Sequence, residues 1–330
     1  MGIAWGVLST ARIGARFVEG ASRTAGADVV AVASRSRGAA QAFAAAHGIP
    51  RAHGSYEALL ADSGVDAIYV PLPNGLHVEW TMRALQAGKH VLCEKPMDRR
   101  PARVTAAFDA AERAGLVLSE GFMWRHHPQA ARLRELLGAD AIGDVRLVRA
   151  CFSFALAAQS DVRLDRALDG GALMDVGCYC VSGARLVAGG EPLSVSAHAV
   201  TRRGVDTRLT ALLRFDRDVL GVIDCGFDLA GRGELEITGS KGRIVLPDPW
   251  LAYHPRIVLE RGDAREVVAV EHADGFALEL EDMCAAIRGQ REPLLGRGDA
   301  LGQARTIEAL YRSAGEGREV RVGYPGPPLA

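Results

Sequence analysis

The sequence predicts an α/β protein of two domains. The first is a doubly wound parallel sheet, and the second is an α+β domain with a large, open-faced, mostly antiparallel sheet. Two patterns predict this: strand and helix signals alternate over the first third of the chain, and strands then follow one another with short turns. The length of 330 residues also exceeds what one hydrophobic core usually covers. We therefore expect domains over residues 1–122 and 123–330.

The first domain consists of short apolar runs that alternate with helical patterns. Runs rich in valine and isoleucine predict strands over residues 3–8, 29–33, 67–70, 90–93 and 117–120. The segments between and after them predict helices over residues 13–20, 38–47, 56–60, 77–87 and 104–114. Repeated strand–helix units imply parallel strands joined by right-handed crossovers.

The pattern changes after Gly143. Strands are expected over residues 145–154, 195–201, 209–215, 219–227, 234–238 and 244–246, with one helix over 172–187. Two closing helices, over 276–288 and 300–316, are expected to pack on the first domain. A sheet of consecutive strands is antiparallel and leaves one face open. Because that face needs a cover, we expect a homodimer or homotetramer formed through it.

Composition excludes several classes of protein. A formal net charge of −1 favours neither nucleic acid nor an anionic membrane as a partner. We see no apolar stretch of membrane-spanning length and no charged-then-apolar leader, so we expect a cytoplasmic protein. The six cysteines sit mostly in apolar segments and are interpreted as reduced core thiols. The adjacent pair His126-His127 is weak support for a metal, and no metal is expected.

The turn after the first strand lies where a dinucleotide-binding (Rossmann) domain carries its G-x-G-x-x-G fingerprint. Here these positions are Ser9, Ala11 and Gly14, so only the third glycine is kept. Small residues still let the backbone approach a pyrophosphate at a helix N-terminus. The candidate cofactor residues of this turn are Ser9, Thr10, Ala11, Arg12 and Ile13. A plain strand–helix turn is the alternative.

The end of the second strand distinguishes NADP from NAD. NAD-specific proteins carry an acidic residue there, which binds the ribose 2′-hydroxyl. This chain has Ser34 and Arg35 instead, and a guanidinium fork suits a 2′-phosphate. The cofactor expected is therefore NADP(H), the alternative being a solvated basic turn.

Glu94-Lys95-Pro96 places a lysine at the carboxyl end of a strand, where open α/β sheets bind ligands. With this motif, the chain resembles the glucose–fructose oxidoreductase / inositol dehydrogenase / rhizopine-catabolism (Gfo/Idh/MocA) family over nearly its whole length. The other motifs of the resemblance are the turn above, Pro71-Leu72-Pro73-Asn74-x-x-His77, the Gly239-Ser240-Lys241-Gly242 segment, and the glycine-rich run from Gly170 to Tyr179. The segments at 120–125 and 162–165 look most like the NADP-dependent branch that holds D-xylose 1-dehydrogenase and trans-dihydrodiol dehydrogenase.

The resemblance implies a Rossmann domain plus an open-faced α+β domain, and a role for each matching residue. Those implied to hold the cofactor are Leu72, Pro73, Asn74, His77, Glu94, Lys95, Trp124 and Arg125. Those implied to hold the substrate, a sugar or similar polyol, are Lys95, Phe154, Arg163, Asp175 and Tyr179. Many members have histidine where this chain has Tyr179.

The implied reaction moves a hydride between the nicotinamide and a carbinol or carbonyl carbon, so a proton must move at the same oxygen. An adjacent ammonium lowers the pKa of a phenol, which makes Tyr179 an acid/base with Lys95 as its partner and Asp175 in support. Each has a structural alternative: a surface lysine for Lys95, a core aromatic for Tyr179 and a helix N-terminal carboxylate for Asp175. Alternative functions are a ketoreductase on a nucleotide-linked sugar and a non-catalytic NADP(H)-sensing regulator.

Overall fold

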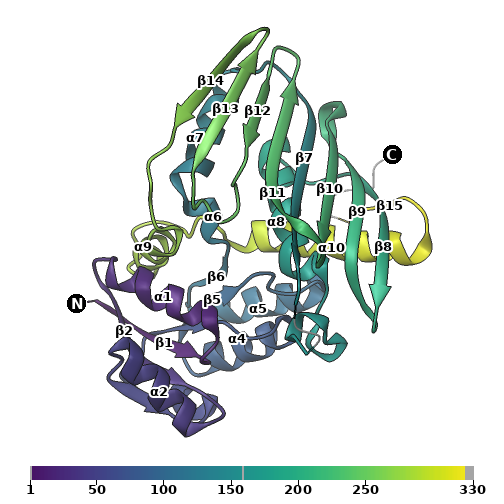
Figure 1. The fold of residues 1–330 in the computed structure, drawn as a ribbon. Helices are drawn as coiled ribbons and strands as arrows, with labels where there is room; N and C mark the ends of the chain where they lie inside the picture. The colour runs from purple at the N-terminus through teal and green to yellow at the C-terminus, as the bar shows by residue number, and fades with distance from the viewer. Residues whose placement is uncertain (1, 158–159, 324–330) are drawn as a thin grey trace. The chain divides into compact units, whose positions relative to one another are not determined.

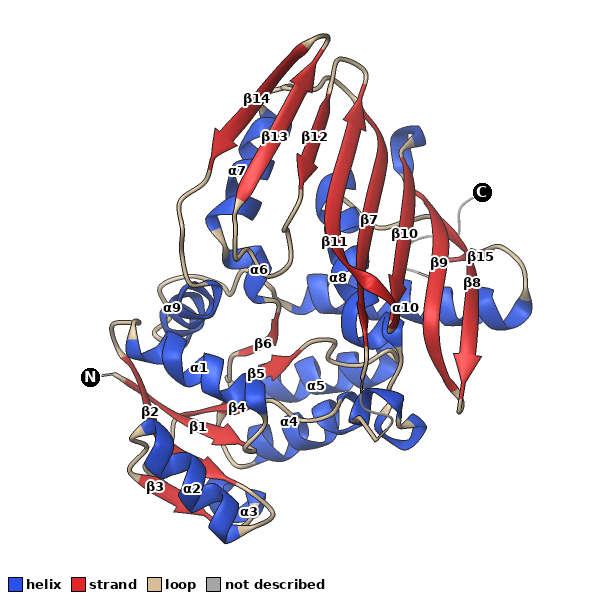
Figure 2. Ribbon diagram, in the orientation of Figure 1, coloured by secondary structure: helices blue, strands red, loops and turns tan. Residues whose placement is uncertain are grey.

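The computed structural model describes residues 2–157 and 160–323, which form two compact units. Unit 1 comprises the chain up to Asp98, Ala102–His126 and Ala273–Leu301. Unit 2 comprises Arg99–Pro101, His127–His272 and the chain from Gly302 onward. Each unit has its own sheet (Figures 1 and 2).

Unit 1 contains a six-stranded parallel sheet. Its strands in spatial order are β3 (Arg51–His53), β2 (Ala27–Ala33), β1 (Ile3–Leu8), β4 (Ala67–Val70), β5 (His90–Glu94) and β6 (Leu118–Gly121). This is the order of dinucleotide-binding sheets, and it reverses direction between β1 and β4. The prediction of a doubly wound parallel sheet is confirmed. The short strand β3 was not predicted, because its sequence Arg-Ala-His has no apolar run.

The five helices predicted between and after these strands are present, the closing helix predicted over 276–288 also belongs to unit 1, and a short helix over 123–126 was not predicted. The helices of unit 1 are α1 (Arg12–Ser22), α2 (Arg37–His47), α3 (Tyr56–Leu60), α4 (His77–Gln86), α5 (Pro101–Ala114), α6 (Met123–His126) and α9 (Gly275–Ile287). Right-handed crossovers from β1 toward β3 and from β4 toward β6 run in opposite directions, which puts α1 on one face and α4 and α5 on the other. The core contains buried Trp5, and the rings of Phe17 and Tyr69 are stacked 4.0 Å apart.

Unit 2 contains a nine-stranded sheet. Its strands in spatial order are β14 (Ala264–Ala269), β13 (Arg256–Arg261), β12 (Arg243–Leu246), β11 (Asp228–Gly239), β7 (Val145–Ala155), β10 (Leu220–Gly226), β9 (Val205–Arg214), β8 (Ser194–Arg202) and β15 (Val320–Arg321). All neighbours are antiparallel except β7 and β10, which are parallel. The prediction of a mostly antiparallel sheet is confirmed.

Three strands of this sheet were not predicted. Both outer strands, β14 and β15, lack a clear pattern, since β14 is almost wholly exposed and β15 is two residues long. The inner strand β13 is buried and apolar over Ile257–Leu259, but a polar sequence surrounds it. Edge strands have one unpaired side and need no continuous apolar run, so sequence periodicity misses them.

Helices cover one face of the nine-stranded sheet. They are α7 (Pro128–Gly138), α8 (Cys178–Ala188) and most of α10 (Arg297–Glu316) (Figures 1 and 2). We expected the helix over 300–316 to pack on the first domain, but from Gly302 onward it belongs to unit 2. Within unit 2, Arg185 Nη1 on α8 donates to Gln303 Oε1 of this helix at 3.1 Å. The other closing helix, α9, is part of unit 1.

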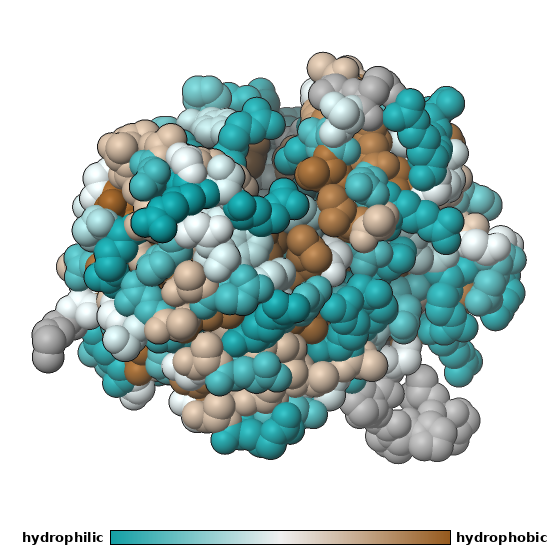
Figure 3. Space-filling view, turned by 90° about the horizontal axis from the view of Figure 1, so that it is seen from below, coloured by the Kyte–Doolittle hydropathy of each residue, from teal (hydrophilic) through white to brown (hydrophobic). Residues whose placement is uncertain are grey.

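The surface carries mixed polarity. Hydrophilic residues cover most of the face in Figure 3, and hydrophobic residues form small groups between them. No helix of the described residues combines the length and apolar character that crossing a bilayer requires. All six cysteines are buried and free, as expected for core thiols.

Candidate functional site

The turn between β1 and α1 has the backbone of a dinucleotide-binding loop. Ser9, at the first fingerprint position, adopts φ +148°, a conformation that favours glycine. Its hydroxyl holds this turn, since Ser9 Oγ donates to Pro71 O at 3.1 Å and accepts from Ala11 N–H at 3.2 Å. Gly14 packs closely, because an added Cβ would lie 3.4 Å from Val7 Cγ1. The serine thus holds a backbone conformation that glycine adopts more readily, with its hydroxyl bonded on both sides.

The N-terminus of α1 fits a phosphate. No side chain caps it at Ala11, and its first turn contains no acidic residue. Arg12 and Ile13 are exposed there, and Thr10 is half-buried. An uncapped helix start with free approach is suited to an anion, so these residues fit the pyrophosphate of a dinucleotide.

The end of β2 carries a basic side chain and no carboxylate. Ser34 is half-buried and Arg35 is exposed. Arg35 lies by Tyr56, whose pKa is raised by burial, while the charge and hydrogen bond of Arg35 act in the opposite direction. This end of the strand fits a 2′-phosphate better than a 2′-hydroxyl.

The loop after β4 is held by His77. Leu72 is buried, and Pro73 and Asn74 are half-buried. His77 is only 1% exposed, with Nε2 at 2.6 Å from Leu72 O and Nδ1 at 2.8 Å from Pro96 O. Burial lowers the pKa of His77, and Lys95 lowers it further. The side chain therefore ties the loops after β4 and β5 together inside the unit.

Lys95 follows directly after β5, and the Lys95–Pro96 peptide is cis. The preceding Glu94 carboxylate accepts from Tyr69 O–H at 2.6 Å and from the Lys95 N–H at 3.2 Å. These bonds fix the backbone from which the lysine projects. Behind the loop, the buried carboxylate of Glu120 accepts from Met97 N–H at 2.6 Å. The lysine thus lies at the carboxyl edge of the sheet, on a loop that hydrogen bonds to Glu94 and Glu120 hold in place.

Trp124 and Arg125 lie on α6. Trp124 is 2% exposed, and the guanidinium of Arg125 lies 5.7 Å from its ring centre. Arg125 Nη1 also pairs with Asp299 Oδ1 at 3.3 Å. Both residues are therefore firmly placed within unit 1.

A buried carboxyl near Glu94 was missed by sequence reasoning. Glu279 on α9 is 1% exposed, and within the described residues its Oε1 has no hydrogen-bond partner. His126 Nε2 lies 3.9 Å from that oxygen. Burial raises the pKa of Glu279 well above its usual value, and the charges of Glu94 and Asp282 add to this. Nothing in the local sequence signals this, because Glu279 follows Glu94 by 185 positions and occupies an otherwise ordinary helix.

In unit 2, two glycines shape the glycine-rich run. An added Cβ at Gly170 would lie 2.4 Å from Arg163 O. At Gly171, which has φ +134°, it would lie 2.1 Å from Asp206 Oδ1. Asp206 accepts from Leu173 N–H at 2.7 Å and Tyr311 O–H at 2.8 Å, and burial raises its pKa to about 6. Asp206 is a second residue that sequence reasoning missed.

These contacts start a π-helical turn over Leu173–Gly177, which leads into α8. Single π-helical turns inside helices are frequent at functional sites. Asp175 lies in this turn and accepts from Arg163 Nε at 2.6 Å. Arg163 also pairs with Asp161 and lies 6.0 Å from the ring centre of Phe154. The structure thus brings together Phe154, Arg163 and Asp175, three of the residues that the resemblance implies for substrate binding.

Tyr179 lies in the first turn of α8 and is 8% exposed. Its ring contacts Phe152 edge-on at 5.5 Å and lies 6.0 Å from Trp250. Trp250 is fixed in turn, since its Nε1 donates to Cys151 O at 2.8 Å. An aromatic cage of this kind limits the motion of the phenol ring.

Comparison with known proteins identifies the family. A model of an oxidoreductase family with an NAD-binding Rossmann fold matches residues 3–122, and a model of the GFO/IDH/MocA C-terminal domain matches residues 130–245. The chain belongs to the GFO/IDH/MocA oxidoreductase family. The family expected from the motifs is therefore confirmed.

Three similar GFO/IDH/MocA proteins illustrate the range of the family. The D-xylose 1-dehydrogenase (NADP(+)) 2 of Haloferax volcanii is 38% identical over 325 residues, 96% of this chain and 99% of that protein. The trans-1,2-dihydrobenzene-1,2-diol dehydrogenase of Xenopus laevis is 36% identical over 266 residues, 79% of this chain and 80% of that protein. A crystal structure of a 3-ketoreductase from Actinomadura kijaniata, in complex with NADP and TDP-benzene, matches with a TM-score of 0.90 and 33% identity, covering 95% and 98% of the two chains.

Proposed function

We propose that this protein is an NADP-dependent oxidoreductase that transfers a hydride between the nicotinamide and a carbinol or carbonyl carbon of a pyranose or similar polyol ring. The observation that carries the proposal is a set of three features at the carboxyl edge of the parallel sheet, where the strand order reverses. An uncapped helix start, a basic strand end with Arg35, and Lys95 all follow strands at this edge. The named dehydrogenase and ketoreductase relatives support the same reading.

The bound cofactor would supply or take the hydride at its nicotinamide ring. The protein would then handle one proton at the reacting oxygen. Tyr179 is the proposed acid/base, since its phenol can give a proton in reduction and take one in oxidation. Lys95 is the proposed cation for that oxygen, and the anchored Glu94 loop holds the direction in which it projects. Arg163 and Asp175 offer a donor and an acceptor for sugar hydroxyls.

His77 takes a different role in this proposal from the one its motif implied. Both of its ring nitrogens face backbone carbonyls, so we propose a positioning role for it. Asn74, Trp124 and Arg125 remain proposed cofactor residues, as do the residues of the first turn.

Cofactor preference tests the first half of the proposal. NADPH should quench tryptophan fluorescence at a concentration at least about tenfold below that needed for NADH, because a charge-assisted fork holds the 2′-phosphate. Arg35→Gln should remove most of this difference, whereas Arg37→Gln serves as a neighbouring control. Equal midpoints for the two coenzymes in the unmodified protein would contradict an NADP site.

Substrate class is tested by following NADPH absorbance with a panel of free sugars, their lactones and nucleotide-linked keto-sugars. Turnover of free pyranoses supports the leading function. Activity confined to nucleotide-linked keto-sugars would favour the second candidate, which the likeness to the Actinomadura kijaniata ketoreductase supports. A Lys95→Ala variant separates both from a non-catalytic sensor: an enzyme loses turnover, whereas a sensor keeps its NADPH response.

We further propose that the protein acts in the cytoplasm on small molecules, as a homodimer or homotetramer formed through the open face of the nine-stranded sheet. Neither nucleic acid nor a membrane is a proposed partner.

A further inference from the structure

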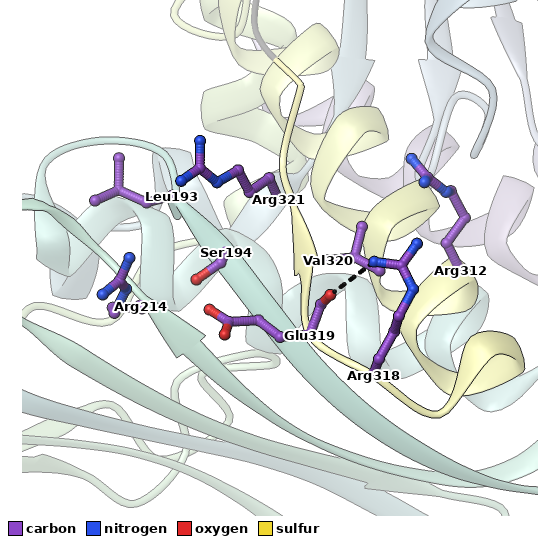
Figure 4. Close-up of a pocket in the computed structure, with 8 residues that line it drawn as sticks. All are labelled: Leu193, Ser194, Arg214, Arg312, Arg318, Glu319, Val320 and Arg321. Carbon is purple, nitrogen blue, oxygen red and sulfur yellow. Dashed lines mark hydrogen bonds between the residues drawn. The ribbon is translucent and has the colours of Figure 1, made fainter. Parts of the chain in front are cut away.

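A pocket of about 540 Å³ lies at one end of the nine-stranded sheet in unit 2 (Figure 4). It involves β8, β9, β15 and the segment at the C-terminal end of α10. Its lining residues are Leu193, Ser194, Arg214, Arg312, Arg318, Glu319, Val320 and Arg321. None of them belongs to the proposed catalytic or coenzyme residues.

The strand register places Ser194 between two arginines. On β8, Ser194 pairs with Arg214 of β9 on one side and with Arg321 of β15 on the other. Directly paired residues project from the same face of a sheet, so these three side chains start from one side, the face on which Leu220, paired with Arg214, also lies. Ser194 is 3% exposed, and its Oγ has no hydrogen-bond partner among residues 2–157 and 160–323. Buried hydroxyl groups normally have a hydrogen-bond partner, so a ligand oxygen that reached Ser194 Oγ would satisfy this group.

The charges of the pocket favour an anion. Arg214 and Arg321 are exposed, and neither forms an ion pair within the described part of the chain. Arg312 pairs with Glu316 at 3.5 Å, and Arg318 pairs with the same carboxylate. Arg318 Nη1 also donates to the backbone oxygen of Glu319 at 3.3 Å, the bond that is dashed in Figure 4. Two of the four lining arginines are therefore neutralised by Glu316, which leaves Arg214 and Arg321 as the cations of the pocket beside the carboxylate of Glu319.

We propose that this pocket binds a phosphate monoester that carries hydroxyl groups, such as a sugar phosphate. Guanidinium groups match phosphate oxygens, and the Ser194 hydroxyl can donate to a third oxygen. The volume lies within the range of small-molecule sites and exceeds that needed for inorganic phosphate alone. Glu319 would accept from a ligand hydroxyl but would repel a second anionic group, so a monoester fits better than a pyrophosphate.

Isothermal titration of the full chain with glucose 6-phosphate tests the proposal directly. We expect one saturable site per chain. Arg321→Gln and Arg214→Gln should each weaken binding by about tenfold or more, since each removes a charge-assisted contact. Ser194→Ala should weaken it severalfold. Arg202→Gln, an exposed arginine at the far end of β8, is the matched control and should leave binding unchanged.

Three outcomes would overturn the proposal. The first is no saturable heat with glucose 6-phosphate. The second is equal affinity for inorganic phosphate, which would remove the hydroxyl-bearing part from recognition. The third is binding that Arg35→Gln abolishes and Arg321→Gln leaves intact, which would place the ligand at the proposed coenzyme turn. Because calorimetry measures ligand binding and not turnover, failure here is separate from failure of the proposed reaction.

Discussion

The role of a single residue in this chain depends on which hydrogen-bonding atoms its neighbours present to it. Glu94 was expected at the nicotinamide, and its carboxylate orders the backbone before Lys95 through two hydrogen bonds. His77 came from the same motif, yet both its ring nitrogens face backbone carbonyls. Residue type alone predicted that these positions matter, but hydrogen-bond partners decide what each side chain does.

Tyr179→Phe tests the acid/base assignment. The variant keeps the ring that packs against Phe152 and loses only the hydroxyl, so the fold and NADPH affinity should be retained. Turnover should fall roughly 100-fold or more, the usual contribution of general acid–base catalysis. Steady-state kinetics and a coenzyme titration on the same sample measure both. Unchanged turnover would remove the phenol from the mechanism.

Glu279→Gln tests the buried carboxyl. Because burial raises the pKa of Glu279, the unfolded chain loses this proton at a lower pH than the folded protein does. The contribution of Glu279 to stability is therefore fully present below the ordinary carboxyl pKa and is lost as the pH rises toward the higher folded value. The glutamine cannot ionise, so it should not show this loss.

Urea unfolding at several pH values measures the effect. Relative to the unmodified protein, the glutamine variant should gain stability between pH 5 and pH 8, by about 1 kcal/mol or more at the upper end. Glu281→Gln, on the same helix, is a suitable control. A stability difference that does not change with pH would mean that Glu279 titrates normally.

At the scale of elements, the run from Gly170 to Tyr179 has an unusual backbone and carries two of the proposed site residues, Asp175 and Tyr179. We expected one helix from residue 172, whereas the structure has a π-helical turn before α8. Where the π-helical turn starts, Asp206 accepts a hydrogen bond from the Leu173 N–H, and its carboxylate occupies the space beside Gly171. Periodicity in the sequence could show that the segment is helical, but not that a carboxylate from β9 meets its first turn.

Gly171→Ala should disrupt the start of the π-helical turn. The added Cβ would lie 2.1 Å from Asp206 Oδ1, and the backbone has φ +134°, so both contact and conformation oppose the change. We expect a loss of about 2 kcal/mol or more in unfolding free energy, together with a loss of turnover. Gly190→Ala is the control, since nothing lies within 4 Å of its added Cβ. Equal stability of the two variants in urea would contradict this account.

At the scale of the whole molecule, the helices of the described residues leave one face of the unit 2 sheet uncovered. The register places Leu212 of β9 opposite Val222 of β10, with Leu220 on the same face two residues along. Leu212 is 60% exposed and Leu220 is 52% exposed. Exposed apolar side chains gathered on one sheet face are typical of an interaction surface.

Self-association through this face is therefore expected to depend on Leu212. Light scattering of the unmodified protein should give a mass of at least twice the 35.0 kDa of one chain. Leu212→Glu should shift the distribution toward the monomer, because it places charge in an apolar contact. Leu294→Glu, at an exposed leucine of unit 1, should not. A monomeric unmodified protein would contradict the proposed assembly.

The sequence by itself determined the alternation of strands and helices, the parallel sheet of unit 1, the mostly antiparallel sheet of unit 2 and the family motifs. These depend on local apolar periodicity and on short motifs, which are written in consecutive residues. Only the tertiary structure decided that His77 turns inward, that Glu279 is buried near Glu94, that Asp206 lies beside Gly171, and that most of α10 belongs to unit 2. The physical reason is that burial and hydrogen bonding depend on residues far apart along the chain, whose approach no local pattern encodes.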